Sequence, residues 1–334
     1  MGMSLKIVIA RPGWRIPGLP YVGLLAVAFV LAAVFPFVSA YIQSMFTEIL
    51  IYAIFALSLN LLIGYSGLFS LGHAAYFGVA AYSFALLSTR AGMTDFWLLA
   101  VIGVSLSAVL SAFFGAIALR ASGVQFLLVT LAIGQLLYSV ATKWRTFTGG
   151  ANGVPAIPFP DLGATSWLLD SRSYFYLVLA VFLVSFIVLY LVANSPFGHA
   201  LRGIHADEGR MNALGYNTWL FKYIAIIIAG LFAGLAGVLY APFAGLVGPM
   251  HLSVTTSSTV MLMVIIGSET VFAGPVLGAA IVILLEYVAS VYMPGRWPLV
   301  LGAVFVLAVM FLRGGVSVHL LRLWNGVTRE RRSA

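Results

Sequence analysis

Residues 60–82 have the sequence N-L-L-I-G-Y-S-G-L-F-S-L-G-H-A-A-Y-F-G-V-A-A-Y and separate two long apolar runs. The stretch is rich in small and polar residues, namely Gly64, Ser66, Gly67, Ser70, Gly72, His73 and Gly78. Non-helical backbone at membrane depth is tolerated only where protein buries it or where it lines a watery cavity. We therefore predict a break between two helices here, either beside a pathway or at a close helix contact.

Composition supports a membrane location for this break. The 334 residues are 62% hydrophobic and 8% charged, with a mean hydropathy of +1.09. Soluble domains carry about 25% charged residues, so we predict an all-α polytopic membrane protein and treat residues 1–334 as one transmembrane domain. The apolar run after Lys6, Arg11 and Arg15 is too long for the core of a cleavable signal peptide, and it lacks a small-residue cleavage site.

Apolar runs predict about ten transmembrane helices, since a span needs about 20 residues. The predicted spans are 21–38, 43–63, 72–89, 96–119, 124–142, 173–193, 223–243, 256–267, 276–292 and 297–312. Some of them are short or broken. As a helix, 256–267 covers only about 18 Å, so it needs neighbours on one side or is re-entrant.

The distribution of Lys and Arg predicts that both termini are cytoplasmic. This topology places twelve of the 17 on the cytoplasmic side and five outside, as the positive-inside rule requires. The cytoplasmic set is Lys6, Arg11, Arg15, Arg120, Arg202, Arg210, Lys222, Arg313, Arg322, Arg329, Arg331 and Arg332; the outer set is Arg90, Lys143, Arg145, Arg172 and Arg296. Residues 143–172 then form an extracytoplasmic loop and 194–222 a cytoplasmic one. The net charge of +8 does not gather into a nucleic-acid-binding patch.

No motif for an enzyme site is present. The chain has no Cys, which excludes thiolate chemistry and Cys-ligated metals. None of its five His has, three or four residues away, a second ligand that is suited to metal binding. A Gly-x-Ser-x-Gly elbow and a P-loop are both missing. We predict no catalytic residue, metal or cofactor, so an ATP-driven role requires a partner that supplies the ATPase.

The polar interval 194–222 predicts short helices outside the membrane. Ser195 and Pro196 are typical of a helix cap and first position. One or two short helices should follow between His199 and Asn212, and Gly215 should end them. A short amphipathic helix that projects from a membrane domain can be moved by a soluble partner, but a solvated connector fits the same residues.

A weak internal sequence similarity involves the residues just before the first break. L-L-I-G at 61–64 resembles V-I-I-G at 264–267, and each precedes a Gly-rich break and a further span. Paired broken segments mark binding sites in many transporters. Four apolar residues also match easily by chance, so the repeat stays open.

An ordered set of motifs resembles the membrane subunits of bacterial ABC importers for branched-chain amino acids. Besides residues 60–78, the motifs are G-V-Q-F-L-L-V-T-L-A at 123–132, T-G-G-A-N-G-V-P-A-I-P at 148–158, S-P-F-G-H-A-L-R-G-I-H-A-D-E at 195–208 and G-P-V-L-G-A at 274–279. The T-G-G-x-x-G segment distinguishes one of the two paired permease subunits of this family. The matches extend over most of the chain.

The resemblance implies a multi-pass subunit of the bacterial cytoplasmic (inner) membrane. Its expected partners are a second homologous permease, two cytoplasmic ATPase subunits and a periplasmic substrate-binding protein, and no nucleic acid. Within 194–222, the resemblance implies that Arg202, Asp207, Glu208 and Gly215 couple the chain to the ATPase. The alanines that usually follow the Glu are Gly209 and Arg210 here.

A second departure lies in the break at 267–275. The family commonly has Gly-Gly-x-Gly followed by Thr or Ser, whereas this chain has Gly267, Ser268, Glu269, Thr270 and Val271. The glycine-dependent backbone conformation expected at this break is therefore in doubt.

We predict that residues in and near the breaks and within two spans line the pathway or its gate. They are Gly64, Ser66, Gly67, Ser70, Gly72, His73, Gln125, Thr130, Glu269 and Glu286. Structural alternatives are open: Ser70 caps the third span, His73 bonds a neighbouring helix, and Gln125 and Thr130 bond between helices. Glu286 and Glu48 either meet an ammonium group or serve a structural or interface role.

The expected function is half of the translocation pathway for branched-chain or other hydrophobic amino acids. Related permeases share these motifs, so urea, short amides or aromatic acids are alternative cargoes. An ion-coupled secondary carrier that uses Glu48 and Glu286 is an alternative of another class. On the predicted topology, the first break lies on the cytoplasmic side and is a candidate inner gate.

Overall fold

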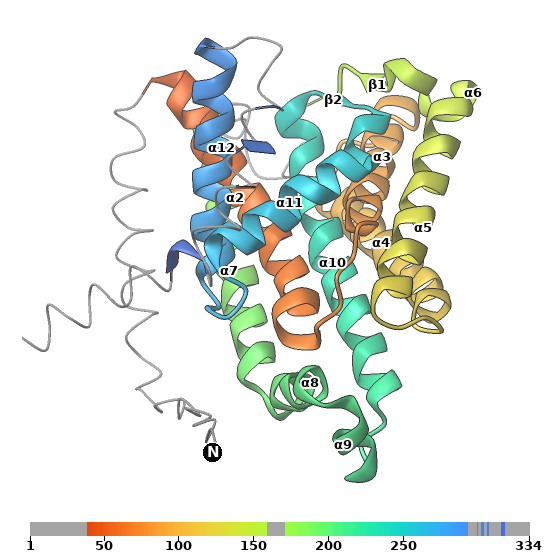
Figure 1. Ribbon diagram of the computed structural model, residues 1–334. Coiled ribbons are helices and arrows are strands. Elements are labelled where there is room, and N and C mark those ends of the chain that lie inside the picture. Colours follow the sequence, from red (N-terminus) through yellow and green to blue (C-terminus); the bar gives the residue numbers. More distant parts are fainter. Residues whose placement is uncertain are drawn as a thin grey trace, which may run out of the picture. The chain divides into compact units, whose positions relative to one another are not determined.

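The computed structural model describes residues 39–158 and 171–292, together with 299, 302–303, 306 and 315–317 (Figure 1). The described elements belong to one contact unit, Ala40–Ala334. Span 21–38 lies outside the described residues, as do most of span 297–312 and residues 159–170 of the predicted outer loop. The single-domain organisation and the location of the termini stay predictions.

Helices dominate the described residues, which confirms the all-α class. The α-helices are α2 (Ala40–Asn60), α3 (His73–Arg90), α4 (Phe96–Ala118), α5 (Val124–Lys143), α6 (Arg145–Thr148), α7 (Ser171–Asn194), α8 (Pro196–Ala206), α9 (Glu208–Ala213), α10 (Thr218–Ala244), α11 (Val254–Gly267) and α12 (Gly274–Tyr292). One π-helical turn, η2 (Leu61–Tyr65), and two 3₁₀-helical turns, η3 (Gly150–Asn152) and η5 (Pro249–Leu252), also lie in the described residues. Strands β1 (Val154–Pro155) and β2 (Leu246–Val247) pair antiparallel, with Val154 opposite Val247.

Six helices in the described part of the chain are long and apolar enough to cross a membrane. They are Tyr41–Tyr65, Phe96–Ala118, Val124–Lys143, Ser173–Asn194, Thr218–Ala244 and Gly274–Tyr292. The helix α11 is apolar but has only 14 residues, in agreement with the short predicted segment. Membrane spanning is thus confirmed, whereas the predicted number of about ten is not.

The predicted third span, α3, is not among the six. It forms as a helix, but 13 of its 18 residues are buried, and it packs against α4, α5 and α10. A helix that is enclosed by other helices does not need lipid-soluble side chains, so its Tyr, Ser and His residues are accommodated. Hydropathy alone therefore describes this central helix poorly.

Small residues bring α10 close to its neighbours. A Cβ atom on Gly230 would lie 2.3 Å from Cβ of Ser111, and one on Gly237 would lie 2.1 Å from the carbonyl oxygen of Phe77. Such close approach replaces the hydrophobic driving force, which is weak between helices in lipid. Ser107 fixes this junction, because its hydroxyl lies 2.8 Å from the Gly230 carbonyl and 3.1 Å from the Tyr76 carbonyl.

The first turn of α3 takes its cap from another helix. Its N-cap is Gly72, with no side-chain hydrogen bond, so the interpretation of Ser70 as the cap is wrong. Instead, the backbone N–H of Ala74 donates to Oγ of Ser257 on α11, at 2.9 Å. A donor in the first turn of a helix has no partner within that helix, so a distant residue satisfies it here.

Substitution Ser257→Ala should destabilise the start of α3. Losing a capping hydroxyl costs about 0.5–2 kcal/mol in unfolding free energy, which reversible denaturation of the purified chain would measure. Thr259→Ala is the matched control, because its hydroxyl bonds Thr255 of its own helix at 3.1 Å. Equal unfolding free energies for the two variants would contradict the capping role.

Candidate functional site

The break predicted from residues 60–82 is present. Helix α2 widens into the π-helical turn η2, and the chain then runs irregularly to the start of α3 at His73. Gly67 has a φ of +67°, a left-handed conformation that glycine adopts without a steric penalty. Single π-helical turns of this kind occur frequently at functional sites.

One side of the break packs tightly on α5. The N–H of Leu71 donates to Oγ1 of Thr130 at 3.2 Å. A Cβ atom on Gly72 would lie 2.2 Å from the Thr130 carbonyl oxygen, and one on Gly134 would lie 3.2 Å from the Cα of Gly72. Gly72 and Thr130, both predicted pathway residues, therefore meet in a close backbone contact.

His73 bonds a neighbouring helix, which is the structural alternative to a role in lining the pathway. The fully buried ring places Nε2 at 2.9 Å from Oγ of Ser58 on α2. Because the Ser58 hydroxyl donates to the Phe55 carbonyl at 2.7 Å, it accepts from His73, so Nε2 carries the proton. Within the described residues, Nδ1 then has no partner.

The second break lies against the first. A Cβ atom on Gly64 would lie 2.3 Å from the carbonyl oxygen of Glu269, so only glycine permits this approach. Ser268 has a φ of +110°, so a serine holds a conformation that favours glycine. The two similar segments, 61–64 and 264–267, are thus followed by breaks that touch. That the two segments form a repeat stays a prediction.

Helix α8 holds the first break from outside the bundle. Helices α8 and α9 project from the lower end in Figure 1, opposite α6. Nδ1 of His205 lies 3.3 Å from the Gly64 carbonyl oxygen, and a Cβ atom on Gly67 would lie 2.6 Å from Cδ2 of the same ring. Arg202 lies over the Tyr65 ring, 5.2 Å from its centroid, and donates to the Ala193 carbonyl at 2.8 Å.

The other predicted coupling residues shape α8 and α9. Asp207 caps α9 through the Arg210 N–H at 3.0 Å, and Gly215, with a φ of +88°, follows the end of this helix. Glu208 forms an ion pair with Lys222 of α10 at 2.6 Å. The predicted start at Ser195 and Pro196 is confirmed, because the Ser195 hydroxyl accepts from the Gly198 N–H at 3.3 Å.

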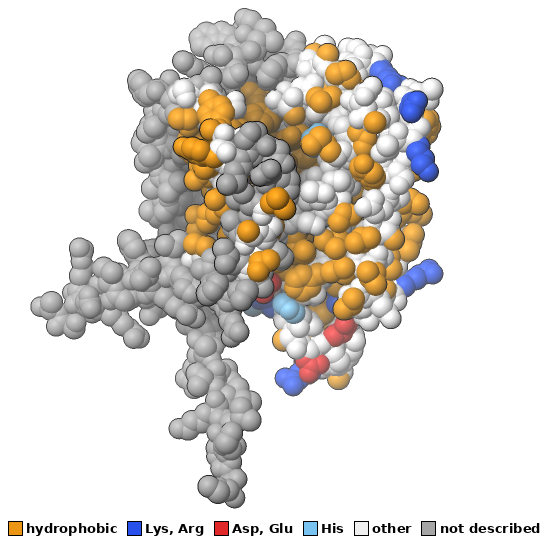
Figure 2. Space-filling model, turned by 45° about the horizontal axis from the view of Figure 1, so that its top comes forward, with side chains coloured by type: hydrophobic (Ala, Val, Ile, Leu, Met, Phe, Trp, Pro, Cys, Tyr) orange, Lys and Arg blue, Asp and Glu red, His pale blue; other side chains and the backbone are white. Residues whose placement is uncertain are grey.

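The projecting end presents a mixed surface. Figure 2 shows acidic, basic and His side chains gathered on it, whereas hydrophobic side chains cover much of the bundle above. No residue of α9 is buried. Leu214 and Tyr216, just beyond α9, expose 67% and 44% of their surface. Exposed apolar side chains with charged neighbours are typical of a protein interface.

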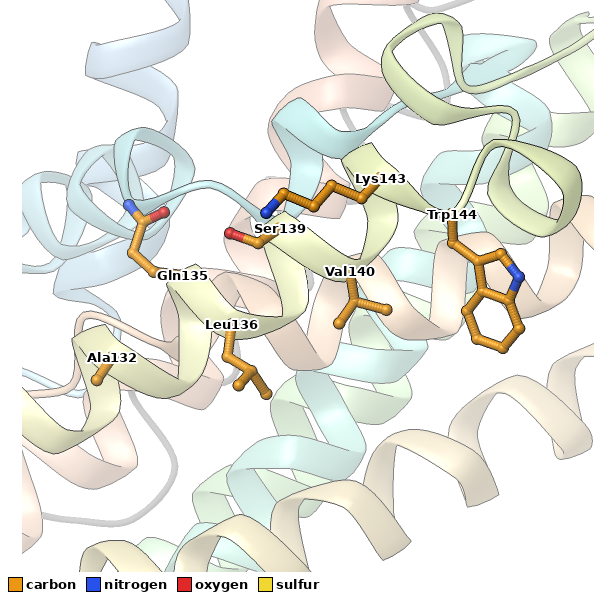
Figure 3. A pocket seen from close by; sticks show the side chains of 7 residues that line it. All are labelled: Ala132, Gln135, Leu136, Ser139, Val140, Lys143 and Trp144. Carbon is orange, nitrogen blue, oxygen red and sulfur yellow. The ribbon is translucent and has the colours of Figure 1, made fainter.

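A polar stripe runs along α5. Figure 3 shows Gln135, Ser139 and Lys143 pointing to one side of this helix, which lines a shallow cavity of about 630 Å³. Gln125 is also exposed and, 18 residues before Lys143, it lies on the same face, since about 3.6 residues make one turn. Polar side chains in a span seek protein or water, so lipid alone is a poor partner for this face.

Two carboxylates lie on helices that are distant in sequence, each in the half of its helix that points away from α8. Glu48 of α2 and Glu286 of α12 interact electrostatically. The Tyr287 hydroxyl donates to Oε2 of Glu48 at 3.0 Å, and its ring lies 5.2 Å from that of Tyr41. The sequence indicates both carboxylates as candidates, but it does not predict that they interact, nor that His205 contacts the first break.

Comparison with known proteins identifies the family. Residues 41–312 match the family described as "Branched-chain amino acid transport system / permease component". The chain is similar to the high-affinity branched-chain amino acid transport system permease protein LivM of Escherichia coli, with 29% identity over 71% of this chain and 61% of that protein. LivM of Salmonella typhimurium is 28% identical over the same shares.

A relative with another printed cargo also matches. The guanosine ABC transporter permease protein NupQ of Bacillus subtilis is 27% identical over 52% of this chain and 53% of that protein. No solved structure matches. The chain spans 61% of the length of the two LivM proteins. Because the family match covers most of the chain and includes all six apolar spans, this multi-pass membrane protein belongs to the family of branched-chain amino acid transport system permease components.

Proposed function

We propose that this chain forms half of the translocation pathway of an ABC importer in the bacterial inner membrane. Its partners in this proposal are a second homologous permease, two cytoplasmic ATPases and a periplasmic binding protein. The cargo is a branched-chain or other hydrophobic amino acid. The observation that carries the proposal is the contact of His205 in α8 with Gly64 in the break, at 3.3 Å.

This contact gives α8 a direct route to the candidate inner gate. When an ATPase moves α8, the His205 ring moves against the backbone of Gly64 and Gly67. Because Gly64 touches the Glu269 carbonyl, the displacement continues into the second break. Packed elements of this kind switch between discrete arrangements rather than deforming gradually. Two breaks in contact therefore form a gate that opens as one unit.

The proposed pathway leads from the carboxylates to this gate. Glu48 and Glu286 lie in the halves of α2 and α12 that point away from α8, and an ammonium group of the cargo would meet them there. The α5 face that carries Gln125, Ser139 and Lys143 needs a partner other than lipid, and the pathway between two permeases provides one. Ser66, Ser70 and Gly72 complete the gate in this proposal.

The carboxylate pair favours an amino acid over a neutral cargo. An ammonium group gains a charge interaction with Glu48 and Glu286 that a nucleoside, urea or a short amide lacks. Membership of an ABC permease family argues against an ion-coupled carrier, in which the same carboxylates would bind the coupling ion.

Substitution His205→Ala should uncouple ATP hydrolysis from transport. Losing one hydrogen bond costs about 1 kcal/mol, so transport per ATP should fall about fivefold in proteoliposomes, while the ATPase stays bound. The matched control is His199→Ala, because its Nδ1 bonds only Ser195 of its own helix in the described structure, at 2.8 Å. An unchanged transport-to-ATP ratio in His205→Ala would refute the route through the break.

A charge swap separates docking by Glu208 from its ion pair with Lys222. Glu208→Lys should weaken ATPase binding about thirtyfold or more, because removing one partner of a desolvated interfacial charge pair costs about 2 kcal/mol or more. The double variant Glu208→Lys/Lys222→Glu restores the pair within the chain but not the charge that faces the ATPase. The double variant should therefore still recover little ATPase in a pull-down. Recovery of as much ATPase as with the wild type would show that Glu208 has a structural role only.

Uptake by membrane vesicles tests the cargo and the energy source. Leucine uptake should require ATP hydrolysis and persist with an uncoupler of the proton gradient, and excess guanosine or urea should not compete. Glu286→Gln removes one charge interaction with the ammonium group of leucine, which is worth about 1 kcal/mol. It should therefore raise the leucine concentration for half-maximal uptake about fivefold. Uptake that survives ATPase inactivation but stops with the uncoupler would show an ion-coupled carrier instead.

A further inference from the structure

An apolar crevice lies between α3, α4 and α5, at the end of the bundle that carries α6. Its volume is about 590 Å³, within the range of pockets that bind small molecules, about 300–1,000 Å³. Leu86 of α3, Leu106 of α4 and Val140 of α5 line three of its sides. The pathway proposed above uses the polar stripe of α5 and not this crevice.

The crevice opens toward the lipid-facing surface. Leu106 and Val140 line it and each exposes 43% of its surface. They belong to α4 and α5, in which only 33% and 22% of the most apolar stretch is buried. Apolar cavities stay free of water, and no described residue of the chain fills this one. An apolar occupant from outside the described part of the chain therefore fits this crevice.

The rim of the crevice carries a cation and an aromatic pair. Arg90, at the end of α3, lines it and is exposed. Its Nη1 donates to the Thr146 carbonyl at 2.7 Å, which uses one of the five N–H donors of the guanidinium. The rings of Trp144 and Phe147 pack 5.0 Å apart and expose 54% and 48% of their surface, as residues at a membrane–water interface do.

We propose that this crevice binds one acyl chain of an anionic phospholipid, whose phosphate group lies at Arg90. The apolar walls accept the chain, the aromatic rim lies at headgroup depth, and the guanidinium complements the anionic charge. The lipid fills the space between α4 and α5 and so supports α5, the least buried of the six spans. This site does not depend on which cargo the permease carries.

Native mass spectrometry of the purified full chain tests the site, with phosphatidylglycerol and phosphatidylethanolamine as probes. The wild type should prefer phosphatidylglycerol about fivefold, and Arg90→Gln should remove this preference, as expected for one interfacial cation. Leu86→Trp fills the crevice and should lower retention of both lipids about tenfold or more, because each lost methylene contact reduces binding about fourfold. Val109→Trp, at a 65% exposed position of α4 outside the crevice, should change neither.

A photo-crosslinking variant identifies the occupant directly. With p-benzoylphenylalanine in place of Leu106, illumination in native membranes should yield a phospholipid adduct. An adduct with a protein segment would overturn the proposal and show that a helix fills the crevice. Equal lipid retention by Leu86→Trp and Val109→Trp would overturn it as well.

Discussion

A single constraint dominates this structure: inside a bilayer, every backbone polar group must find its partner within the protein. Where α2 ends, the π-helical turn bends back, so the N–H of Leu68 donates to the Leu62 carbonyl at 2.9 Å. Thr130 and Ser257 then supply hydroxyl oxygens for the N–H groups of Leu71 and Ala74. At the end of the first break, tertiary contacts with α5 and α11 thus replace the hydrogen bonds that a continuous helix would make.

Glycine and serine carry out complementary tasks in this arrangement. Gly64 and Gly72 let the break approach carbonyl groups of Glu269 and Thr130 to distances at which a methyl group could not fit. Serine hydroxyls are small enough to enter the same junctions and also bond what they meet there, as Ser107 does between α4, α3 and α10. Because hydrophobic driving force between helices is weak in lipid, close packing and hydrogen bonds hold the bundle together.

Local signals in the sequence predicted local structure well. Ser195 and Pro196 start α8 and Gly215 follows α9, because helix caps depend on neighbouring positions. Contacts between residues far apart in the sequence could not be predicted. Ser257 caps a helix that begins 184 positions earlier, and His205 contacts Gly64, 141 positions away. The burial of α3 was also missed, since hydropathy measures lipid solubility and not enclosure by other helices.

The placement of α8 explains how the first break and residues 194–222 would move together in the proposed importer. A helix outside the membrane can move an intramembrane element only where rigid contacts link them. Here, Arg202 joins α8 to the end of α7 and to Tyr65, while His205 joins it to Gly64. Both contacts fall on η2, whose π-helical turn is already a departure from regular helix. In the proposed importer, force from α8 would therefore enter the bundle at this turn, and Glu269, whose carbonyl lies against Gly64, would receive it next.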